Sequence, residues 1–245
     1  MHPAFGHILG RLTRLLPNTT RITTDRVAAD FFLPSFDHHI GKDLRALRAG
    51  AREPRLYDWI ENFTDGSVFF DVGTHHGQEA VWAACQRDKT IHVTGFDCGL
   101  LQSHFCALNS ALNRTINGQN FDFVFAAVGA TSGEMIPIEA NSDTHIPRLH
   151  KKNAPYLYQV PSVALDDYAA QNNLSPTHLK IDVDGAEAEV IAGAATLLAG
   201  DVLQEIFIEI DPVNKDLADV IKTYGFHAAW ERHKPENSEY LFVRG

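Results

Sequence analysis

From about residue 67 onward the chain alternates apolar runs with amphipathic segments, and this alternation limits its fold more than any other feature. The runs that predict buried strands are 67–72, 90–97, 121–129, 177–184 and 203–210. The segments whose apolar residues recur at helical spacing are 78–87, 100–112, 186–198 and 214–224. Because strands that alternate with helices form βαβ units, the sequence predicts a doubly wound, mostly parallel α/β sheet with helices on both faces.

The C-terminal region departs from this alternation. The stretches "GFHAAWE" (225–231) and "EYLFVR" (239–244) follow each other without a helix between them, which predicts an antiparallel hairpin at one edge of the sheet. In the middle of the chain, the section from residue 130 through 155 is expected to be rich in loops, and a short strand is expected over 159–165.

Residues 1–54 are predicted to form an N-terminal extension outside the alternating unit. They are rich in Arg and are broken by Pro17 and Pro34, and we expect them to be helical or irregular. A helix over 55–63, with its apolar residues on one face, then begins the main domain, which we place at 55–245.

Composition and charge narrow the class of protein. The net charge of −10 and the lack of a dense basic run argue against nucleic acid as a partner. No apolar run approaches the roughly 20 residues that span a bilayer, and the N-terminal stretch does not resemble a secretory signal. The three cysteines have no CxxC spacing and predict reduced thiols, so we expect a cytoplasmic protein.

The first predicted strand runs into a glycine turn, "FFDVGTHHG" (69–77). A turn in this position is the usual cofactor contact of a doubly wound sheet. A dinucleotide fingerprint would read G-x-G-x-x-G, but here only Gly73 and Gly77 are present. Asp71 would repel a phosphate and suits a cofactor that carries a positive charge. A tight turn that binds nothing is the alternative.

Asp97 ends the second predicted strand. An acid there can accept hydrogen bonds from both ribose hydroxyls, as it does in NAD sites, so Asp97 indicates a ribose-bearing cofactor without choosing between candidates. S-adenosylmethionine has a ribose, a sulfonium and an ammonium but no phosphate. We expect Asp71 to meet its ammonium, directly or through water, and the first amides of the helix 78–87 to meet its carboxylate.

A second acidic cluster lies in "LKIDVDGAEAEV" (179–190). Side chains alternate along a strand, so Lys180, Asp182 and Asp184 are expected to share one direction. Burial of three charges on one sheet face is costly unless they line a polar cleft. Glu187 opens the next helix, where a negative charge is favourable. The alternative is structural, with Asp184 as a helix cap and Lys180 paired to Asp182.

Glu209 lies at the end of the next apolar run, "IFIEI" (206–210), and is followed by Asp211 and Pro212. This position suggests that Glu209 faces the same cleft as the second acidic cluster. A solvated strand end is the alternative.

Together these motifs resemble the FkbM-type methyltransferase family. The matching stretches are "FFDVGTHHG", "GFD", "AAVGATSGE", "VALDDY", "LKIDVDGAEAEVIAGA" and "IFIEI". The most specific is "KIDVDGAE" with the "VIAGA" that follows it, and the resemblance covers about residues 55–244. It implies a class I, Rossmann-like fold with a seven-stranded sheet, S-adenosylmethionine as the cofactor, and transfer of methyl to a hydroxyl oxygen of a sugar, polyketide or similar metabolite.

The resemblance also implies which residues hold the cofactor. They are Asp71, Gly73, Thr74, His75, Gly77, Asp97, Ala127 and Asp182. The family usually carries a small residue and Asn where Thr74 and His75 stand, and Glu-Pro where Asp97 and Cys98 stand. Asp and Glu do the same work at the ribose, whereas His75 changes the contacts expected at the methionine end.

An alcohol acceptor must lose its proton during or after attack on the methyl group, so a nearby base helps. Asp182 is the first candidate, because the strands that precede it and Asp71 are expected to flank the switch point of the sheet. Glu209 and His75 are lesser candidates. Asp184 and Glu187 are expected to bind substrate or to shape the turn. Paired acids could instead hold Mg²⁺ against a diol, but we favour a metal-free site.

Three other functions share parts of this pattern. A nicotinamide-dependent oxidoreductase would share the fold and Asp97, but the chain has no Tyr-x-x-x-Lys pair and no complete phosphate fingerprint. A methyltransferase acting on nucleic-acid amines often carries Asp/Asn-Pro-Pro-Tyr where this chain has "DVDG". A non-catalytic protein that binds the cofactor is the third. We expect a small-molecule or glycan acceptor; a homo-oligomer is left open.

Overall fold

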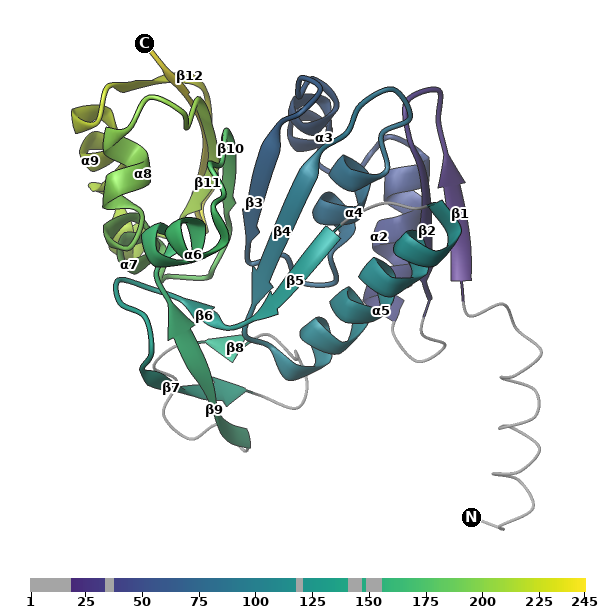
Figure 1. Ribbon diagram of the computed structural model, residues 1–245, viewed down its shortest axis with the longest axis horizontal. Helices are drawn as coiled ribbons and strands as arrows, with labels where there is room; N and C mark the ends of the chain where they lie inside the picture. The colour runs from purple at the N-terminus through teal and green to yellow at the C-terminus, as the bar shows by residue number, and fades with distance from the viewer. Residues whose placement is uncertain (1–18, 34–37, 118–120, 141–146, 149–155) are drawn as a thin grey trace.

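The computed structural model describes residues 19–33, 38–117, 121–140, 147–148 and 156–245. Its centre is a seven-stranded sheet with the order β12-β13-β11-β10-β3-β4-β5 (Figure 1). The strands are β3 (Val68–Val72), β4 (His92–Asp97), β5 (Phe121–Phe125), β10 (His178–Ile181), β11 (Glu205–Ile210), β12 (Phe226–His233) and β13 (Ser238–Arg244). The first five are parallel and β13 is antiparallel to both neighbours, which confirms the predicted doubly wound sheet and its edge hairpin.

The strand order reverses between β3 and β10. The chain adds β4 and β5 on one side of β3 and then returns to its other side, where Lys180 lies opposite Asp71 in the register. The carboxyl ends of strands at such a reversal form the usual binding crevice of this fold.

Helices cover both faces of the sheet. They are α3 (Pro54–Glu61), α4 (Gln78–Ala84), α5 (Leu100–Asn117), α6 (Leu165–Asn172), α7 (Glu187–Ala192), α8 (Ala195–Ala199) and α9 (Leu217–Thr223), with a 3₁₀ turn η1 at Pro212–Asn214. Two apolar cores result, one on each face, because successive side chains of a strand point to opposite faces. In β3, Phe69 is buried in one core and its neighbour Phe70 in the other.

The helix predicted over 186–198 is in fact two short helices, α7 and α8. A Cβ on Gly193 would lie 2.1 Å from the carbonyl oxygen of Gly129, so the backbone passes too close for a regular helix surface. The Asp166 carboxylate then accepts hydrogen bonds from Thr196 N (2.7 Å) and Leu197 N (2.9 Å) and caps the second helix.

The prediction that residues 1–54 are helical or irregular is wrong in part. Residues Thr19–Thr23 (β1) and Ala28–Phe32 (β2) form an antiparallel hairpin, and His38–Arg48 (α2) is helical. Residues 1–18 lie outside the described residues. The buried apolar side chains of the hairpin and α2 belong to the same core as α3 and α4, so this segment packs on the main sheet.

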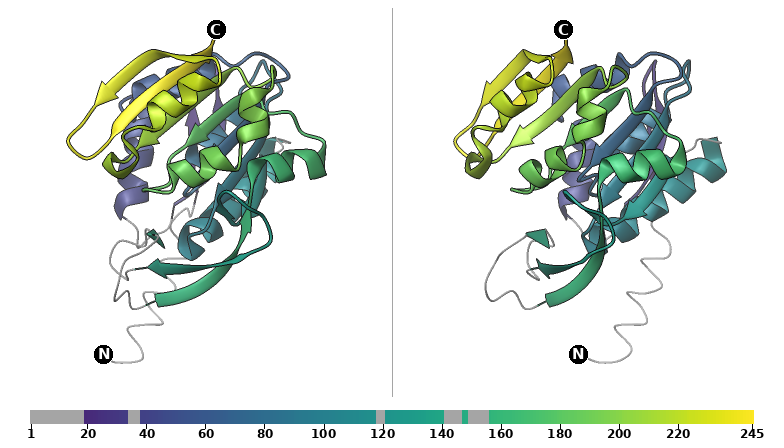
Figure 2. Two further views of the ribbon diagram at one scale, coloured as in Figure 1. Left: turned by 90° about the vertical axis from the view of Figure 1, so that its left-hand side faces the viewer. Right: turned by 60° about the vertical axis from the view of Figure 1, so that its left-hand side comes forward.

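The middle of the chain contains more strands than were predicted, because β7 (Met135–Ala140) and β8 (Pro147–Arg148) lie in the section expected to be rich in loops. β6 (Ala127–Val128), β7, β8 and β9 (Tyr156–Val163) form a small sheet. The strand predicted over 121–129 is thus divided into β5 and β6, and the short strand expected at 159–165 is the second half of β9. Figure 2 shows β7 and β9 projecting beyond the main sheet.

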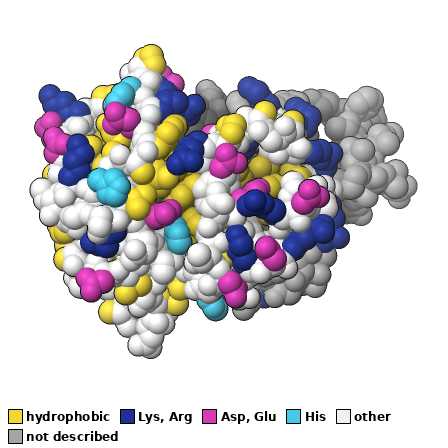
Figure 3. Space-filling view, turned by 90° about the horizontal axis from the view of Figure 1, so that it is seen from above, with side chains coloured by type: hydrophobic (Ala, Val, Ile, Leu, Met, Phe, Trp, Pro, Cys, Tyr) yellow, Lys and Arg dark blue, Asp and Glu magenta, His cyan; other side chains and the backbone are white. Residues whose placement is uncertain are grey.

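Two further observations concern the charges on the surface and the length and apolar character of the helices. On the face shown in Figure 3, basic and acidic side chains are interspersed. Among the helices of the described residues, none combines the length and apolar character of a bilayer-spanning segment.

Candidate active site

A cavity of about 240 Å³ opens at the carboxyl ends of β3, β4 and β10. One part of its lining is apolar and another part is charged. Apolar side chains come mainly from the ends of β4 and from β6 and β7: Phe96, Ala126, Ala127, Val128 and Ile138. Charged side chains come from α2, the residues before α3, α4, the end of β4, and β10 with the turn that follows it: Asp43, Arg52, Glu53, Glu79, Asp97, Lys180, Asp182 and Asp184. The cavity therefore offers both an apolar surface and a strongly polar one.

Most of the predicted cofactor residues are brought together here. Gly73, His75, Asp97, Ala127 and Asp182 all line the cavity, and so does Asp184, which was expected to bind substrate or to shape the turn. Asp71, Thr74 and Gly77 do not line it and lie behind its wall. Glu187 and Glu209 line a neighbouring cavity instead.

The glycine turn after β3 lies very close to the backbone at the end of β10. Gly73 has φ 76°, and an added Cβ would lie only 1.7 Å from the carbonyl oxygen of Asp182. The N–H groups of Gly73 and Thr74 both donate to the carbonyl oxygen of Phe96, at 2.9 and 3.0 Å. Only glycine allows the turn to lie this close to the end of β10, because the carbonyl oxygen of Asp182 occupies the space that a Cβ would take.

Asp71 holds the turn from behind. It is fully buried, accepts a hydrogen bond from the Thr74 hydroxyl (2.7 Å), and lies 3.4 Å from Lys180 Nζ. Burial raises the pKa of Asp71, although the Lys180 ammonium opposes this. Lys180 also lies 3.5 Å from the Asp182 carboxylate, so one ammonium joins both acids. Asp182 thus sits beside Asp71 as predicted, while the direct contact of Asp71 with an ammonium stays a prediction.

Asp97 joins the turn to the end of β4. Its two carboxylate oxygens accept hydrogen bonds from the backbone N–H groups of His75 (2.9 Å) and Gly99 (2.7 Å). Burial raises the pKa of Asp97 to about 7, and these two hydrogen bonds oppose the rise. His75 takes a left-handed backbone (φ 53°) to make its contact, which is uncommon for a residue other than glycine. A carboxylate is therefore held at the cavity wall with further lone pairs available to a hydroxyl.

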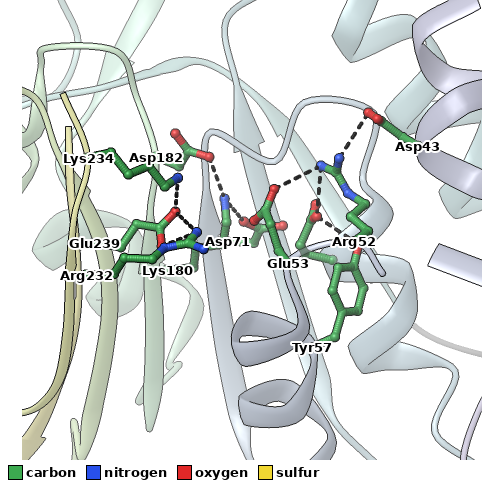
Figure 4. A network of polar contacts seen from close by, with 11 residues as sticks. Asp43, Arg52, Glu53, Tyr57, Asp71, Lys180, Asp182, Arg232, Lys234 and Glu239 are labelled. Carbon is green, nitrogen blue, oxygen red and sulfur yellow. Dashed lines mark hydrogen bonds and ion pairs between the residues drawn. The ribbon is translucent and has the colours of Figure 1, made fainter. Parts of the chain in front are cut away.

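A network around Arg52 was missed by the sequence analysis (Figure 4). The Arg52 guanidinium lies 3.1 Å from Asp43, 3.4 Å from Glu79 and 3.7 Å from Glu53. Tyr57 donates its hydroxyl to Glu79 at 2.9 Å. Although burial opposes it, the Arg52 charge lowers the pKa of Glu79.

The local signal for this network was "REP" at 52–54, a charged pair before a proline at the start of a helix. That signal marks a helix boundary and says nothing of a site some twenty residues away in the sequence.

A second, acidic cavity of about 200 Å³ adjoins the first. It is lined by Asp182, Asp184, Glu187, Glu209, Asp211, Glu236 and Asn237, so Asp182 and Asp184 border both cavities. Glu209 was expected to face the same cleft as the second acidic cluster, and it shares this cavity with Asp182 and Asp184, although it does not line the first one. Burial raises the pKa of Glu209 to about 7, and the charge of Asp182 adds to the rise. Among the described residues, no group of three or more His, Cys, Asp or Glu side chains has the arrangement of a metal site.

The strand that carries the second acidic cluster is shorter than predicted. β10 ends at Ile181, and Asp184 has a left-handed backbone (φ 52°), so Asp182 and Asp184 belong to the turn that follows. Glu187 accepts hydrogen bonds from Gly185 N (2.7 Å) and from the Asn214 side chain. Both of its oxygens are therefore engaged in holding this turn, which is one of the two roles expected of Glu187.

Comparison with known proteins places the chain. A family model described as "Methyltransferase FkbM domain" matches residues 71–231, and no curated protein matches. The solved methyltransferase FkbM from Methylobacillus flagellatus KT has 14% identity and a TM-score of 0.55, over 84% of this chain and 55% of that chain. This chain thus spans little more than half the length of that structure.

Two further structures have lower TM-scores. A Streptococcus pneumoniae protein in complex with S-adenosyl-L-methionine has 12% identity and a TM-score of 0.49, over 79% of this chain and 72% of that chain. A SAM-dependent methyltransferase from Agrobacterium tumefaciens has 8% identity and a TM-score of 0.49, over 94% and 71%. The family match, which covers more than half of the 245 residues, and the Rossmann-like fold agree: the chain belongs to the FkbM methyltransferase family, whose cofactor is S-adenosylmethionine.

Proposed function

We propose that this protein transfers a methyl group from S-adenosylmethionine to a hydroxyl oxygen of a small metabolite or glycan. The observation that carries the proposal is the division of the cavity wall into apolar and charged residues, with the Asp97 carboxylate present on it. When bound, S-adenosylmethionine supplies an electrophilic methyl group on its sulfonium. Its adenine, ribose and amino-acid parts need an apolar surface, a carboxylate and charged groups respectively.

The residues present fit such a cofactor. Phe96, Ala127 and Ile138 offer apolar surface for a base, and Asp97 can accept from ribose hydroxyls. Gly73 lines the cavity with its backbone alone, so a ligand can approach the main chain of the turn there. The charged residues of the cavity wall can pair with the charged groups of the cofactor's amino-acid part.

We place the methyl acceptor in the acidic cavity, because it adjoins the cofactor cavity and shares Asp182 and Asp184 with it. A wall with six carboxyl groups disfavours an anionic acceptor and suits a neutral polyol or a cationic one. This preference narrows the class of acceptors to be screened.

Proton removal from the acceptor falls first to Asp182. It borders both cavities, and Lys180 at 3.5 Å holds its carboxylate in place. Glu209 is the second candidate, since a carboxyl group whose pKa is near 7 can take up and release a proton at neutral pH. Burial lowers the pKa of His75, which weakens its ring as a base.

Calorimetric titration tests the cofactor site. S-adenosylhomocysteine should bind the wild-type protein and NAD should not, and Asp97→Ala should lose S-adenosylhomocysteine. Transfer of labelled methyl to a panel of neutral polyols, amines and sugar phosphates then tests the acceptor class. Binding of NAD, or transfer mainly to the sugar phosphates, would contradict the proposal.

A further inference from the structure

Glu53 has an unusual backbone for its position. It is the residue that precedes α3, and its φ of 36° lies in the left-handed region that residues other than glycine rarely adopt. A polar residue at a helix start normally accepts hydrogen bonds from the first turn, but the Glu53 side chain makes no such bond. Left-handed strain of this kind persists where the surrounding structure enforces it, often at ligand sites. The structure therefore directs this carboxylate away from its own helix.

The side chain points into the cofactor cavity. Glu53 lines the cavity together with Gly73, His75 and Asp182. In Figure 4 its carboxylate is directed between the side chains of Lys180 and Arg52. Among the described residues, its one ion pair is with Arg52, at 3.7 Å.

Arg52 does not balance the charge of Glu53. The same guanidinium is closer to Asp43, at 3.1 Å, and to Glu79, at 3.4 Å. Lys180, the other cation of the wall, lies between Asp71 and Asp182. The Glu53 side chain is 43% exposed. Its partial burial, and after it the charge of Glu79, raises the pKa of Glu53, while the charges of Arg52 and Lys180 oppose the rise.

The charged residues of the cavity thus carry more negative than positive groups. The two lining cations are Arg52 and Lys180, and the lining acids are Asp43, Glu53, Glu79, Asp97, Asp182 and Asp184, with buried Asp71 a further acid behind them. A cationic group bound here would relieve that imbalance. The amino-acid part of the cofactor carries such a group, its α-ammonium.

We propose that Glu53 accepts a hydrogen bond from the α-ammonium of S-adenosylmethionine, so that the segment before α3 completes the cofactor site. This inference rests on the proposed function of the cavity. It makes Glu53 a cofactor-binding residue supplied from outside the glycine turn, and it gives the left-handed backbone at this residue a functional reason.

Titration of three ligands into wild type and Glu53→Gln tests the inference. The ligands are S-adenosylhomocysteine, its analogue without the α-amino group, and methylthioadenosine, which lacks the whole amino-acid part. Glu53→Gln should weaken S-adenosylhomocysteine by about tenfold or more, the usual range for a charge-assisted hydrogen bond, and leave the other two affinities unchanged. Asp58→Asn, an exposed acid on α3 outside the cavity, is the matched control and should bind all three like wild type.

Two results would overturn the role of Glu53. One is an unchanged affinity of Glu53→Gln for S-adenosylhomocysteine, and the other is an equal loss for all three ligands, which would show an effect on the fold. A wild type that binds neither S-adenosylhomocysteine nor methylthioadenosine is a separate result. It would reject the cofactor site itself and the inference with it.

Discussion

Gly73 and the carbonyl group of Asp182 approach each other so closely that no side chain fits between them. Gly73→Ala should therefore lower the free energy of unfolding by more than about 1 kcal/mol, because the added methyl group would displace the end of β10. For the same reason the variant should lose S-adenosylhomocysteine binding. Thermal unfolding and calorimetry measure the two effects.

Gly133→Ala is the matched control for Gly73→Ala. Gly133 has a similar φ of 88°, but nothing lies within 4 Å of its added Cβ, so this variant reports the backbone strain alone. If both variants lost the same stability, the approach to Asp182 would not be the reason for glycine at residue 73.

The carboxyl group of Asp97 gives the cofactor site a pH dependence. Only the ionised form can accept from both ribose hydroxyls, and its pKa is about 7. The affinity for S-adenosylhomocysteine should be constant above that pH and should fall about tenfold per unit as the pH drops below it. Calorimetry between about pH 5.5 and 8.5 measures the profile.

Glu209→Gln serves as the control for the Asp97 profile. Glu209 also has a pKa of about 7, but it faces the acidic cavity only, so the profile should persist in this variant. A wild-type affinity that does not change with pH would contradict the role of Asp97 at the ribose.

At the scale of elements, the N-terminal hairpin is attached to α5 by side-chain amides. Asn113 donates to the carbonyl oxygen of Asp30 (2.7 Å) and accepts from its N–H (3.0 Å), and Asn109 accepts from Phe32 N (2.7 Å). These amides pair with β2 as a neighbouring strand would. The edge of the hairpin is satisfied in this way only after α5 has packed against it.

Asn113→Ala should lower the free energy of unfolding by about 2 kcal/mol, because it leaves a buried N–H and a buried carbonyl of Asp30 without this partner. Urea unfolding measures the change. Asn172→Ala, at an exposed position of α6, should change it by less than about 0.5 kcal/mol. Equal effects of the two substitutions would mean that the amide contacts do not hold the hairpin.

At the scale of the whole molecule, the extension and the main sheet share one apolar core. Phe31 of β2 is fully buried in the same core as Phe69 of β3. The boundary predicted between residues 54 and 55 stays a prediction, but the packing of the hairpin and α2 leads us to expect a single unfolding unit.

Phe31→Ala tests this expectation. All three Trp residues lie after residue 54, so Trp fluorescence reports the main domain alone. If the core is shared, the substitution should lower the stability seen by Trp fluorescence by about 3–5 kcal/mol, with a single transition. Thr23→Ala, on the exposed side of β1, should leave it nearly unchanged. A Trp transition that does not move in Phe31→Ala would show that the extension unfolds independently.

Features that depend on interactions local in the sequence could be predicted, whereas features that depend on contacts between distant segments could not. Hydrophobic periodicity is a local property, and it predicted the five parallel strands, the edge hairpin and most helices. Residues that sequence rules place at the carboxyl ends of neighbouring parallel strands must meet, which is why Gly73, Asp97 and Asp182 were identified together. The break between α7 and α8 was not predictable, because it depends on the carbonyl of Gly129, far away in the sequence.

The sequence by itself thus determined the order of the strands in the main sheet, the reversal between β3 and β10, the family, and the acids that end the central strands. Tertiary structure alone decided that residues before α3 complete the cavity, that Glu209 faces an adjoining one, and that residues 19–32 form a hairpin against α5. The physical reason is that these features depend on contacts between segments far apart in the chain. Such contacts form only when the whole fold packs, and no local pattern of residues encodes them.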